Sequence, residues 1–411
     1  MQGVEYAIKR YEASLKEIER LKQSEFPYPN SSEALAELEK VFQKQLDALG
    51  KLTPANTPLV RKNACTQSLY TLFLYTPFLG LILRSTNIRN AFEVYYPLLR
   101  IARILLGPSV RLILSSEWDY SPFTYMPDDE LKDFVLIGHP AQESSNPLLI
   151  PLAGHELGHN VWEQMGLSAK YDSAVRKTVV GMIDSQFWVE FQQLFPHIKK
   201  GTLETDLFAY ETWLPAQIWG MRQLEESFCD AMGLRLFGEA YLHAFAYLLS
   251  PSLPGERAVY YPNMKDRVDY LTVASKQMSL TIPSGFGDLF DAEEEPKEAS
   301  QKLLMSVADT ACKKHLPEMI SEARTYANTC MAPTRSQSVV ANIVEQFDLV
   351  IPTKGKVNIT DIINAGWICY HNASLWGSVP QIESADKLRI LHDLILKSLE
   401  VTEFEERISA P

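Results

Sequence analysis

Two histidines and a glutamate stand at a spacing that suits a metal ion. In His155-Glu156-Leu157-Gly158-His159 the histidines are four residues apart, so on a helix both imidazoles lie on one face, a single turn apart. Glu156 is rotated about 100° from His155 around the helix axis, which places it beside the ion, where it can take a proton from a bound water. This HExxH segment therefore predicts a zinc-binding helix with Glu156 as general base. Two core histidines that make ordinary hydrogen bonds are the alternative.

A third ligand is needed, because catalytic zinc is usually held by three protein groups and keeps one position open for water. Downstream, Glu226 and Asp230 are four residues apart in the apolar stretch Trp213–Phe237. We expect Glu226 to bind the metal and Asp230 to accept a hydrogen bond from a ligating imidazole, which fixes the tautomer of that ring and raises its basicity. Glu225 is the alternative ligand, although its neighbour one turn on, Cys229, is a poorer hydrogen-bond acceptor.

The combination HExxH…ExxxD resembles the gluzincin group of metallopeptidases, which includes thermolysin-like and CAAX-prenyl-protease-like families. A third segment, Tyr261-Pro262-Asn263-Met264-Lys265-Asp266-Arg267 followed by Leu271, is similar to the His-Pro…Arg…Leu segment that follows the zinc glutamate in the second of these families. Tyr261 stands in place of its histidine, and Asn263 stands where a second proline is common. The resemblance covers roughly residues 110 to 271.

The resemblance implies a hydrolase with one catalytic zinc ion on His155, His159 and Glu226, which cleaves peptide bonds in peptide or protein substrates. The alternative is a catalytically inactive helical scaffold or binding module that keeps a peptidase fold. It also implies a small sheet beside the active-site helix, whose edge strand pairs with an extended substrate. Here that strand is expected at Phe134–Ile137, and His139 just after it is expected to be an ordinary loop residue.

A peptidase of this kind also needs a donor for the negative charge that develops on the scissile carbonyl oxygen. The position of Tyr261 in the resembling segment favours this residue. Tyr260, His243 and Arg267 also follow Glu226 at plausible distances, and Arg267 can instead be a structural ion-pair residue.

The remaining pattern predicts a mainly α protein with a small β-sheet, an α+β zincin-like catalytic domain flanked by helical regions. Residues 1–107 form an N-terminal helical region that begins with a helical hairpin, because apolar residues recur at three- and four-residue steps. Residues 108–282 form the catalytic domain, with short strands at Val110–Leu114 and Phe134–Ile137. An exposed linker or loop at Pro283–Glu298 precedes a C-terminal helical region at 297–411.

Composition excludes several classes of function. The 411 residues carry a formal charge of −12, which argues against nucleic-acid binding and against docking on an anionic membrane. The apolar segment Leu69–Leu83 is shorter than the roughly 20 residues of a membrane span, so we expect a core helix and no stable membrane insertion; a membrane anchor is the rival. The five scattered cysteines and an N-terminus without an apolar leader lead us to expect reduced thiols and a cytoplasmic protein.

Overall fold

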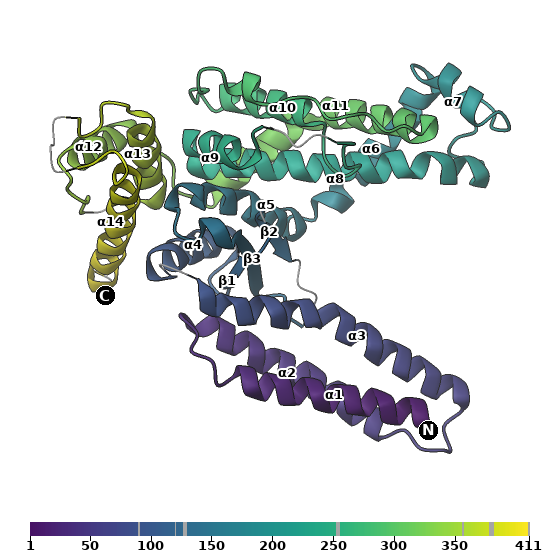
Figure 1. Cartoon of the computed structure of the whole chain (residues 1–411). Coiled ribbons are helices and arrows are strands. Elements are labelled where there is room, and N and C mark those ends of the chain that lie inside the picture. Colours follow the sequence, from purple (N-terminus) through teal and green to yellow (C-terminus); the bar gives the residue numbers. More distant parts are fainter. Residues whose placement is uncertain are drawn as a thin grey trace. The chain divides into compact units, whose positions relative to one another are not determined.

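The computed structural model is mainly helical, with fourteen α-helices and one small sheet in the part of the chain that it describes, as the sequence predicts (Figure 1). The described residues are 1–88, 91–119, 121–125, 130–251, 255–355, 357–377 and 382–409. The chain divides into two compact units. Unit 1 contains residues 1–103 and 107–146, and unit 2 contains residues 104–106 and 147–411. These bounds differ from the three regions expected from the sequence, because the strands belong with the N-terminal helices.

Unit 1 begins with the expected helical hairpin, formed by α1 (Gln2–Leu21) and α2 (Pro29–Gly50), and continues with α3 (Pro58–Arg84) and α4 (Ala91–Leu106). The inner faces of α1, α2 and α3 meet the sheet in one apolar core, which includes Tyr11, Phe42, Phe78 and Leu136. The Tyr28 hydroxyl accepts a hydrogen bond of 2.7 Å from the backbone N–H of Leu114. This bond fixes the start of α2 on the first strand.

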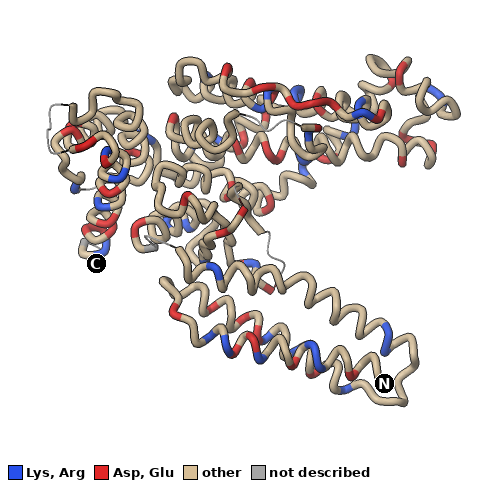
Figure 2. Tube along the Cα trace, viewed as in Figure 1, with Lys and Arg blue, Asp and Glu red and all other residues tan. Residues whose placement is uncertain are grey.

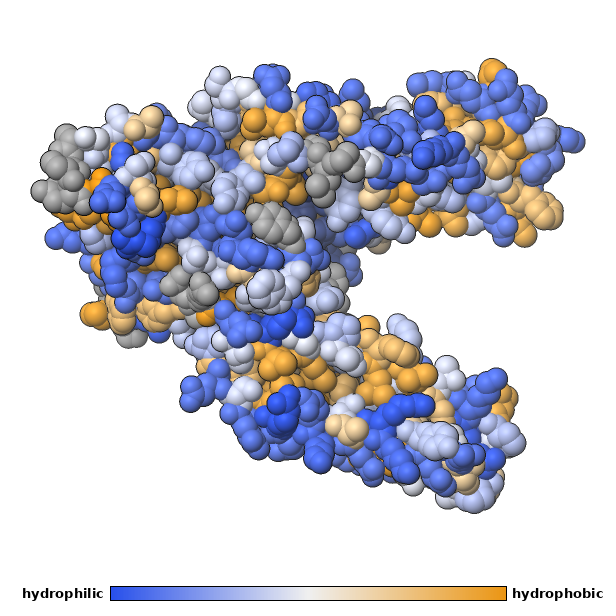
Figure 3. Space-filling view, in the orientation of Figure 1, coloured by the Kyte–Doolittle hydropathy of each residue, from blue (hydrophilic) through white to orange (hydrophobic). Residues whose placement is uncertain are grey.

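Helix α3 carries the apolar segment that raised the question of a membrane span. Within the described residues, only the stretch Pro58–Asn87 is long and apolar enough to cross a membrane, and core helices of soluble proteins pass the same test. Its charges lie near its two ends (Figure 2). One face, with Tyr75 and Phe78, is buried in the core as expected, whereas Phe73 on the other face is 73% exposed. Figure 3 shows hydrophobic residues gathered over part of these helices.

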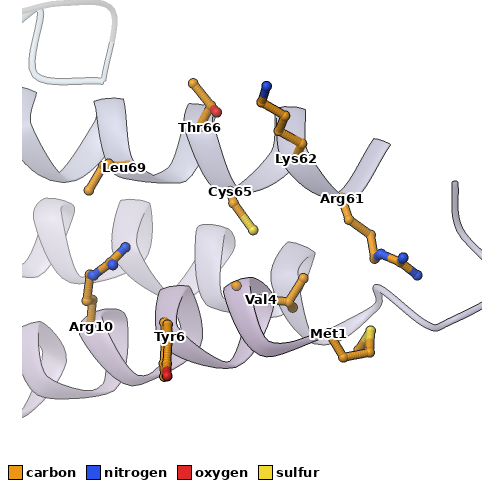
Figure 4. A pocket seen from close by; sticks show the side chains of 10 residues that line it. Met1, Val4, Tyr6, Arg10, Arg61, Lys62, Cys65, Thr66 and Leu69 are labelled. Carbon is orange, nitrogen blue, oxygen red and sulfur yellow. The ribbon is translucent and has the colours of Figure 1, made fainter. Parts of the chain in front are cut away.

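A shallow hollow of about 400 Å³ lies between α1 and α3 at the end where the chain begins. Figure 4 shows Cys65 pointing from α3 toward α1, while Lys62 points away. The Arg61 guanidinium, also at the rim, donates to the backbone carbonyl of Pro54 at 3.0 Å. The cationic groups at this hollow therefore do not converge on one point.

The sheet has three strands in the order β1-β3-β2 (Arg111–Glu117, Phe134–Pro140 and Phe123–Tyr125). Strand β3 pairs in parallel with β1, with Ile113 opposite Leu136, and antiparallel with β2, with Thr124 opposite Ile137. The expectation that Phe134–Ile137 forms the edge strand is therefore wrong, because both of its sides carry a partner. His139 is likewise not a loop residue, since the strand continues through it to Pro140.

Unit 2 is built around the 31-residue helix α8 (Leu207–Phe237). The helices α5 (Ala153–Gln164), α6 (Leu167–Asp184), α10 (Met264–Gln277) and α11 (Ala299–Thr329) pack against it. The other elements of unit 2 are η3 (Pro147–Leu152), α7 (Trp188–Leu194), α9 (Glu239–Leu249), η4 (Phe286–Leu289), α12 (Gln337–Asp348), α13 (Ile359–His371) and α14 (Lys387–Ser409). The C-terminal helical region expected at 297–411 begins with α11, which packs along α8.

Glycines let α5 and α8 approach each other closely. A Cβ atom at Gly158 would lie 2.8 Å from the Cα of Cys229, and one at Gly154 would lie 3.1 Å from the Cα of Gly233. Real Cβ atoms essentially never approach within 3.0 Å of another atom, and a contact of 3.0–3.4 Å is tighter than nine in ten real ones. The two glycines that weaken the HExxH helix locally are therefore what allows this helix to contact α8.

The segment 283–298 is largely exposed, as expected, but it is a loop that is fixed to unit 2 at a few buried residues. Phe286 and Phe290 are each 2% exposed, and both rings pack on Phe245 of α9. A side-chain oxygen of Glu293 accepts the backbone N–H of Met264 at 3.0 Å. Two aromatic side chains thus bind this acidic segment to the surface of unit 2.

Candidate metal centre

The two imidazoles of the motif lie on one helix, as the spacing requires. His155, Glu156 and His159 all fall in α5, whose start follows directly on the short helix η3. The ring centroids of the two histidines are 5.0 Å apart, with the planes nearly perpendicular. His155 and Glu156 are buried and His159 is half-buried.

Glu226 of α8 faces both of these rings. Its Oε2 atom is 3.2 Å from Nε2 of His155, and its Oε1 atom is 3.7 Å from Nε2 of His159. The Glu226 side chain is only 3% exposed. As long as Nε2 of His155 carries no proton, the Oε2 atom of Glu226 has no hydrogen-bond donor among the described residues, and its ionic neighbour, Nη2 of Arg267, is 3.7 Å away. A buried carboxylate oxygen without a donor is costly, and a cation between the three side chains would satisfy it.

The other nitrogen of each imidazole is held by a carboxylate of its own. Nδ1 of His155 lies 2.9 Å from Oδ1 of Asp230, and Nδ1 of His159 lies 2.8 Å from Oε1 of Glu225. Arg222 donates in turn to the second oxygen of Glu225. With both Nδ1 atoms as donors, the lone pairs of both Nε2 atoms remain available on the side of Glu226.

Asp230 is the most strongly held of these carboxylates. Arg267 of α10 donates to it twice, from Nε at 2.7 Å and from Nη2 at 2.8 Å, and the Tyr241 hydroxyl donates at 2.7 Å. Burial raises the pKa of Asp230, but the charge and hydrogen bonds of Arg267 and His155 outweigh burial and hold this pKa well below its usual range. Asp230 is therefore a fixed anion that orients His155.

The electrostatics separate the acidic groups of the site into two kinds. Burial raises the pKa of Glu156, and the nearby histidines only partly oppose this shift. For Glu226, burial also raises the pKa, but the hydrogen bond and charge of His155 with the charge of Arg267 more than compensate, so the pKa is lowered. Glu226 thus stays ionised, while Glu156 is the carboxyl group that takes up a proton more readily.

Cys229 offers another donor atom close to the histidines. One ligand atom from each of His155, His159 and Cys229 can be chosen so that all lie within 4.8 Å of one another. The thiol lies in the tight contact between α5 and α8, and burial raises its pKa well above the ordinary value. We favour Glu226 over Cys229 as the third ligand, because Glu226 is ionised and faces both Nε2 atoms.

The four candidates for the oxyanion donor lie at different places relative to the candidate metal centre. The Arg267 guanidinium lies 5.7 Å over the ring of Tyr261, and the charge of Glu226 is the main cause that raises the Tyr261 pKa, so Tyr261 lies at the edge of this site. His243 lies instead against Trp367 and His371 of α13. Tyr260 is half exposed. Arg267 is engaged in the ion pair with Asp230, the structural role weighed for it.

Sequence reasoning missed two partners of this site. Glu225 was considered only as an alternative metal ligand. Its contact with Nδ1 of His159 could not be predicted, because the two residues lie on different helices and no spacing rule within one helix relates them. Tyr241 is buried like an ordinary core residue, but its hydroxyl donates to Asp230. One signal in the sequence could have pointed to Glu225. Because Glu225 directly precedes Glu226, its side chain is rotated about 100° around α8 from that of Glu226 and lies beside the proposed ligand.

Comparisons of this chain with protein-family models, with curated proteins and with solved structures found no match. The resemblance to gluzincins therefore stays a prediction that rests on the motif residues.

Proposed function

We propose that this protein is a zinc-dependent metallopeptidase with one catalytic zinc ion on His155, His159 and Glu226. The observation that carries the proposal is the arrangement of one carboxylate opposite two Nε2 atoms whose rings are each held by another carboxylate. A structural ion-pair cluster needs no such arrangement on both rings.

The donor set and its spacing fit zinc. Imidazole nitrogen and carboxylate oxygen bind zinc at about 2.0–2.2 Å, so two ligands of a tetrahedral site lie roughly 3.3 Å apart. The contacts of Glu226 with the two rings, 3.2 and 3.7 Å, fall near this value. Opposite neutral rings the Oε2 atom of Glu226 lacks a hydrogen-bond donor, which adds a reason to expect a cation there.

Zinc at this position would lower the pKa of a water molecule and polarise the carbonyl group of a substrate. Glu156 then acts as the proton carrier: it accepts the proton of the attacking water and delivers it to the leaving amine. Burial raises the pKa of Glu156 above its ordinary value, and a carboxyl group with a raised pKa is the better base toward the attacking water. Asp230 and Glu225 orient the two imidazoles, and Tyr261 at the edge of the site is the proposed donor to the developing oxyanion.

Peptides or proteins are the proposed substrates, since this ligand set mostly serves peptide hydrolysis. We also propose that the protein acts in the cytoplasm. A mixture of internally quenched peptides of random sequence is the first substrate to use.

The test uses the full chain, loaded with zinc, and two variants of one helix. Glu156→Gln is expected to keep one zinc per chain and to lose activity by about 10²–10⁴-fold. Glu163→Gln removes a carboxylate from the exposed face of α5 and is the matched control, with zinc content and activity unchanged. His159→Ala is expected to lose both zinc and activity.

Zinc content by elemental analysis separates the alternatives. Full activity in Glu156→Gln would refute its role as general base. A chain that holds no zinc after reconstitution would refute the metal site and favour the inactive scaffold, whereas stoichiometric zinc without cleavage of any peptide would point to a metal-binding module.

A further inference from the structure

A second cavity lies in unit 2, and its walls come from three elements other than α5 and α8. Its volume is about 680 Å³, within the range of roughly 300–1,000 Å³ that is typical of small-molecule sites. Helix α9 contributes His243, Ala246 and Tyr247, and helix α13 contributes Trp367, Ile368 and His371. The segment with the buried Phe286 forms the third wall.

Three flat rings among the lining residues stack on one another. The imidazoles of His243 and His371 lie at 20° and 22° to the indole of Trp367, with centroids 5.2 and 5.6 Å away. The indole N–H donates to the backbone carbonyl of Leu148 at 3.0 Å, and the Trp367 side chain is buried. The hydrogen bond and the burial of Trp367 therefore hold the ring stack in place without a ligand.

The cavity offers polar groups but no charge. None of its thirteen lining residues is an aspartate, glutamate, lysine or arginine. Burial lowers the pKa of His243 to about 4, with a smaller contribution from His371, and burial lowers the pKa of His371 as well. Both imidazoles are therefore neutral at pH 7.

The two histidines share one hydrogen bond of 3.0 Å between Nδ1 of His243 and Nε2 of His371. A neutral imidazole has one N–H donor and one acceptor nitrogen. Whichever ring donates in the shared bond, the pair retains one further donor and one further acceptor. The site can thus recognise a polar group by hydrogen bonds without a compensating charge.

We propose that this cavity binds an uncharged, planar aromatic small molecule with a hydrogen-bonding group. The volume accommodates such a molecule, the aromatic walls favour stacking, and the histidine pair supplies the hydrogen bonds. A charged ligand is disfavoured, because it would lose hydration without meeting an opposite charge. The proposal is independent of the metal site, since none of its residues is a proposed zinc ligand.

The test uses two fluorescent probes that differ by one charged group. N-phenyl-1-naphthylamine is an uncharged aromatic amine, and 8-anilinonaphthalene-1-sulfonate carries the same rings with an anionic sulfonate. Both are titrated at pH 7.5 into the full chain and into Ala246→Phe, which fills the cavity from α9. Ala341→Phe places the same ring on the exposed surface of α12 and is the matched control.

The neutral probe is expected to bind the full chain and Ala341→Phe equally, and Ala246→Phe at least tenfold more weakly. The sulfonate probe is expected to bind the same site at least tenfold more weakly than the neutral one. If Ala246→Phe does not fold, Ile368→Trp takes its place. Ile368 is 47% exposed, so a larger side chain there disturbs the core little, and the tryptophan fills the cavity from α13. Equal binding of the neutral probe to the full chain and the folded filling variant would overturn the proposal, as would equal binding of both probes at this site.

Discussion

Replacing Gly158 by alanine tests whether the contact between α5 and α8 sets the geometry of the metal centre. The added methyl carbon would lie 2.8 Å from the Cα and 3.0 Å from the Cβ of Cys229. An ordinary contact requires at least 3.4 Å, so the two helices must separate locally by roughly half an ångström. Gly158 lies between His155 and His159, and Cys229 lies one turn from Glu226. The separation therefore moves the proposed ligands apart.

Two opposing effects decide the stability of Gly158→Ala. Alanine favours the helix over glycine by about 1 kcal/mol, whereas overpacking a tight contact costs about 1–3 kcal/mol. Gly181→Ala in α6 isolates the first effect, because a Cβ atom at Gly181 meets no heavy atom within 4 Å. We expect Gly181→Ala to raise the free energy of unfolding by up to about 1 kcal/mol, and Gly158→Ala to lower it by up to about 2 kcal/mol.

The assay combines urea unfolding in the presence of a chelator with zinc affinity from a competition titration. Gly158→Ala is expected to bind zinc at least tenfold more weakly, because coordination tolerates displacements of only about 0.2 Å. Gly181→Ala is expected to bind zinc as the unmodified chain does. If both variants are stabilised alike and both keep full zinc affinity, the close helix contact does not position the ligands and the reasoning fails.

Three further outcomes follow from the contacts. Asp230→Asn and Glu225→Gln are each expected to lower zinc affinity by about 10–100-fold in the same competition titration; unchanged affinity in both would exclude their role in orienting the rings. Asp230→Asn is also expected to destabilise the fold by about 3–5 kcal/mol, because it leaves a buried guanidinium without its partner, whereas Glu225→Gln costs less than about 1 kcal/mol, since Arg222 is half exposed. Because the pKa of His243 falls from 6.5 to about 4, the neutral ring contributes stability that is complete above pH 6.5 and is lost as the pH falls through 4, by up to roughly 3 kcal/mol. Urea unfolding at pH 4 and pH 7.5 measures this loss. His243→Asn should lose less stability between pH 7.5 and pH 4 than the unmodified chain does. The control His197→Asn, at an exposed position, should lose as much as the unmodified chain.

The sequence predicts the elements of the site well, because the chemistry of that site imposes helical spacing. HExxH requires one helix, and the pair Glu226 and Asp230 requires a second one with an apolar face. Both helices are present, and Glu226 meets both rings. The short strands were located from their β-branched and apolar runs near Val110 and Phe134.

Strand order and long-range contacts were less accessible to sequence reasoning. Which strand is central depends on which strands pair, and the three-residue strand at Phe123 is too short to give a periodic signal. The acidic segment after Pro283 has the composition of a linker, yet burial of Phe286 and Phe290 outweighs its charge. The contact of Glu225 with His159 depends on how α8 is rotated against α5, which no local pattern specifies.

The charges at the candidate metal centre give an independent reason to expect a divalent cation. Four carboxyl groups meet there: Glu156, Glu225, Glu226 and Asp230. Two guanidinium groups, those of Arg222 and Arg267, face them. With neutral imidazoles, two negative charges remain uncompensated in a largely buried cluster, which is costly. In the polypeptide alone, a proton on His155 supplies one of these charges: burial lowers the pKa of His155, but Asp230 and Glu226 outweigh burial and raise this pKa to about 10. Burial also raises the pKa of Glu156, which favours its neutral form. A divalent cation carries the same two charges and binds at the Nε2 atom that the proton occupies. Metal and protons therefore compete for one cluster, and a chain selected only for a stable core would not need four buried acids around two histidines.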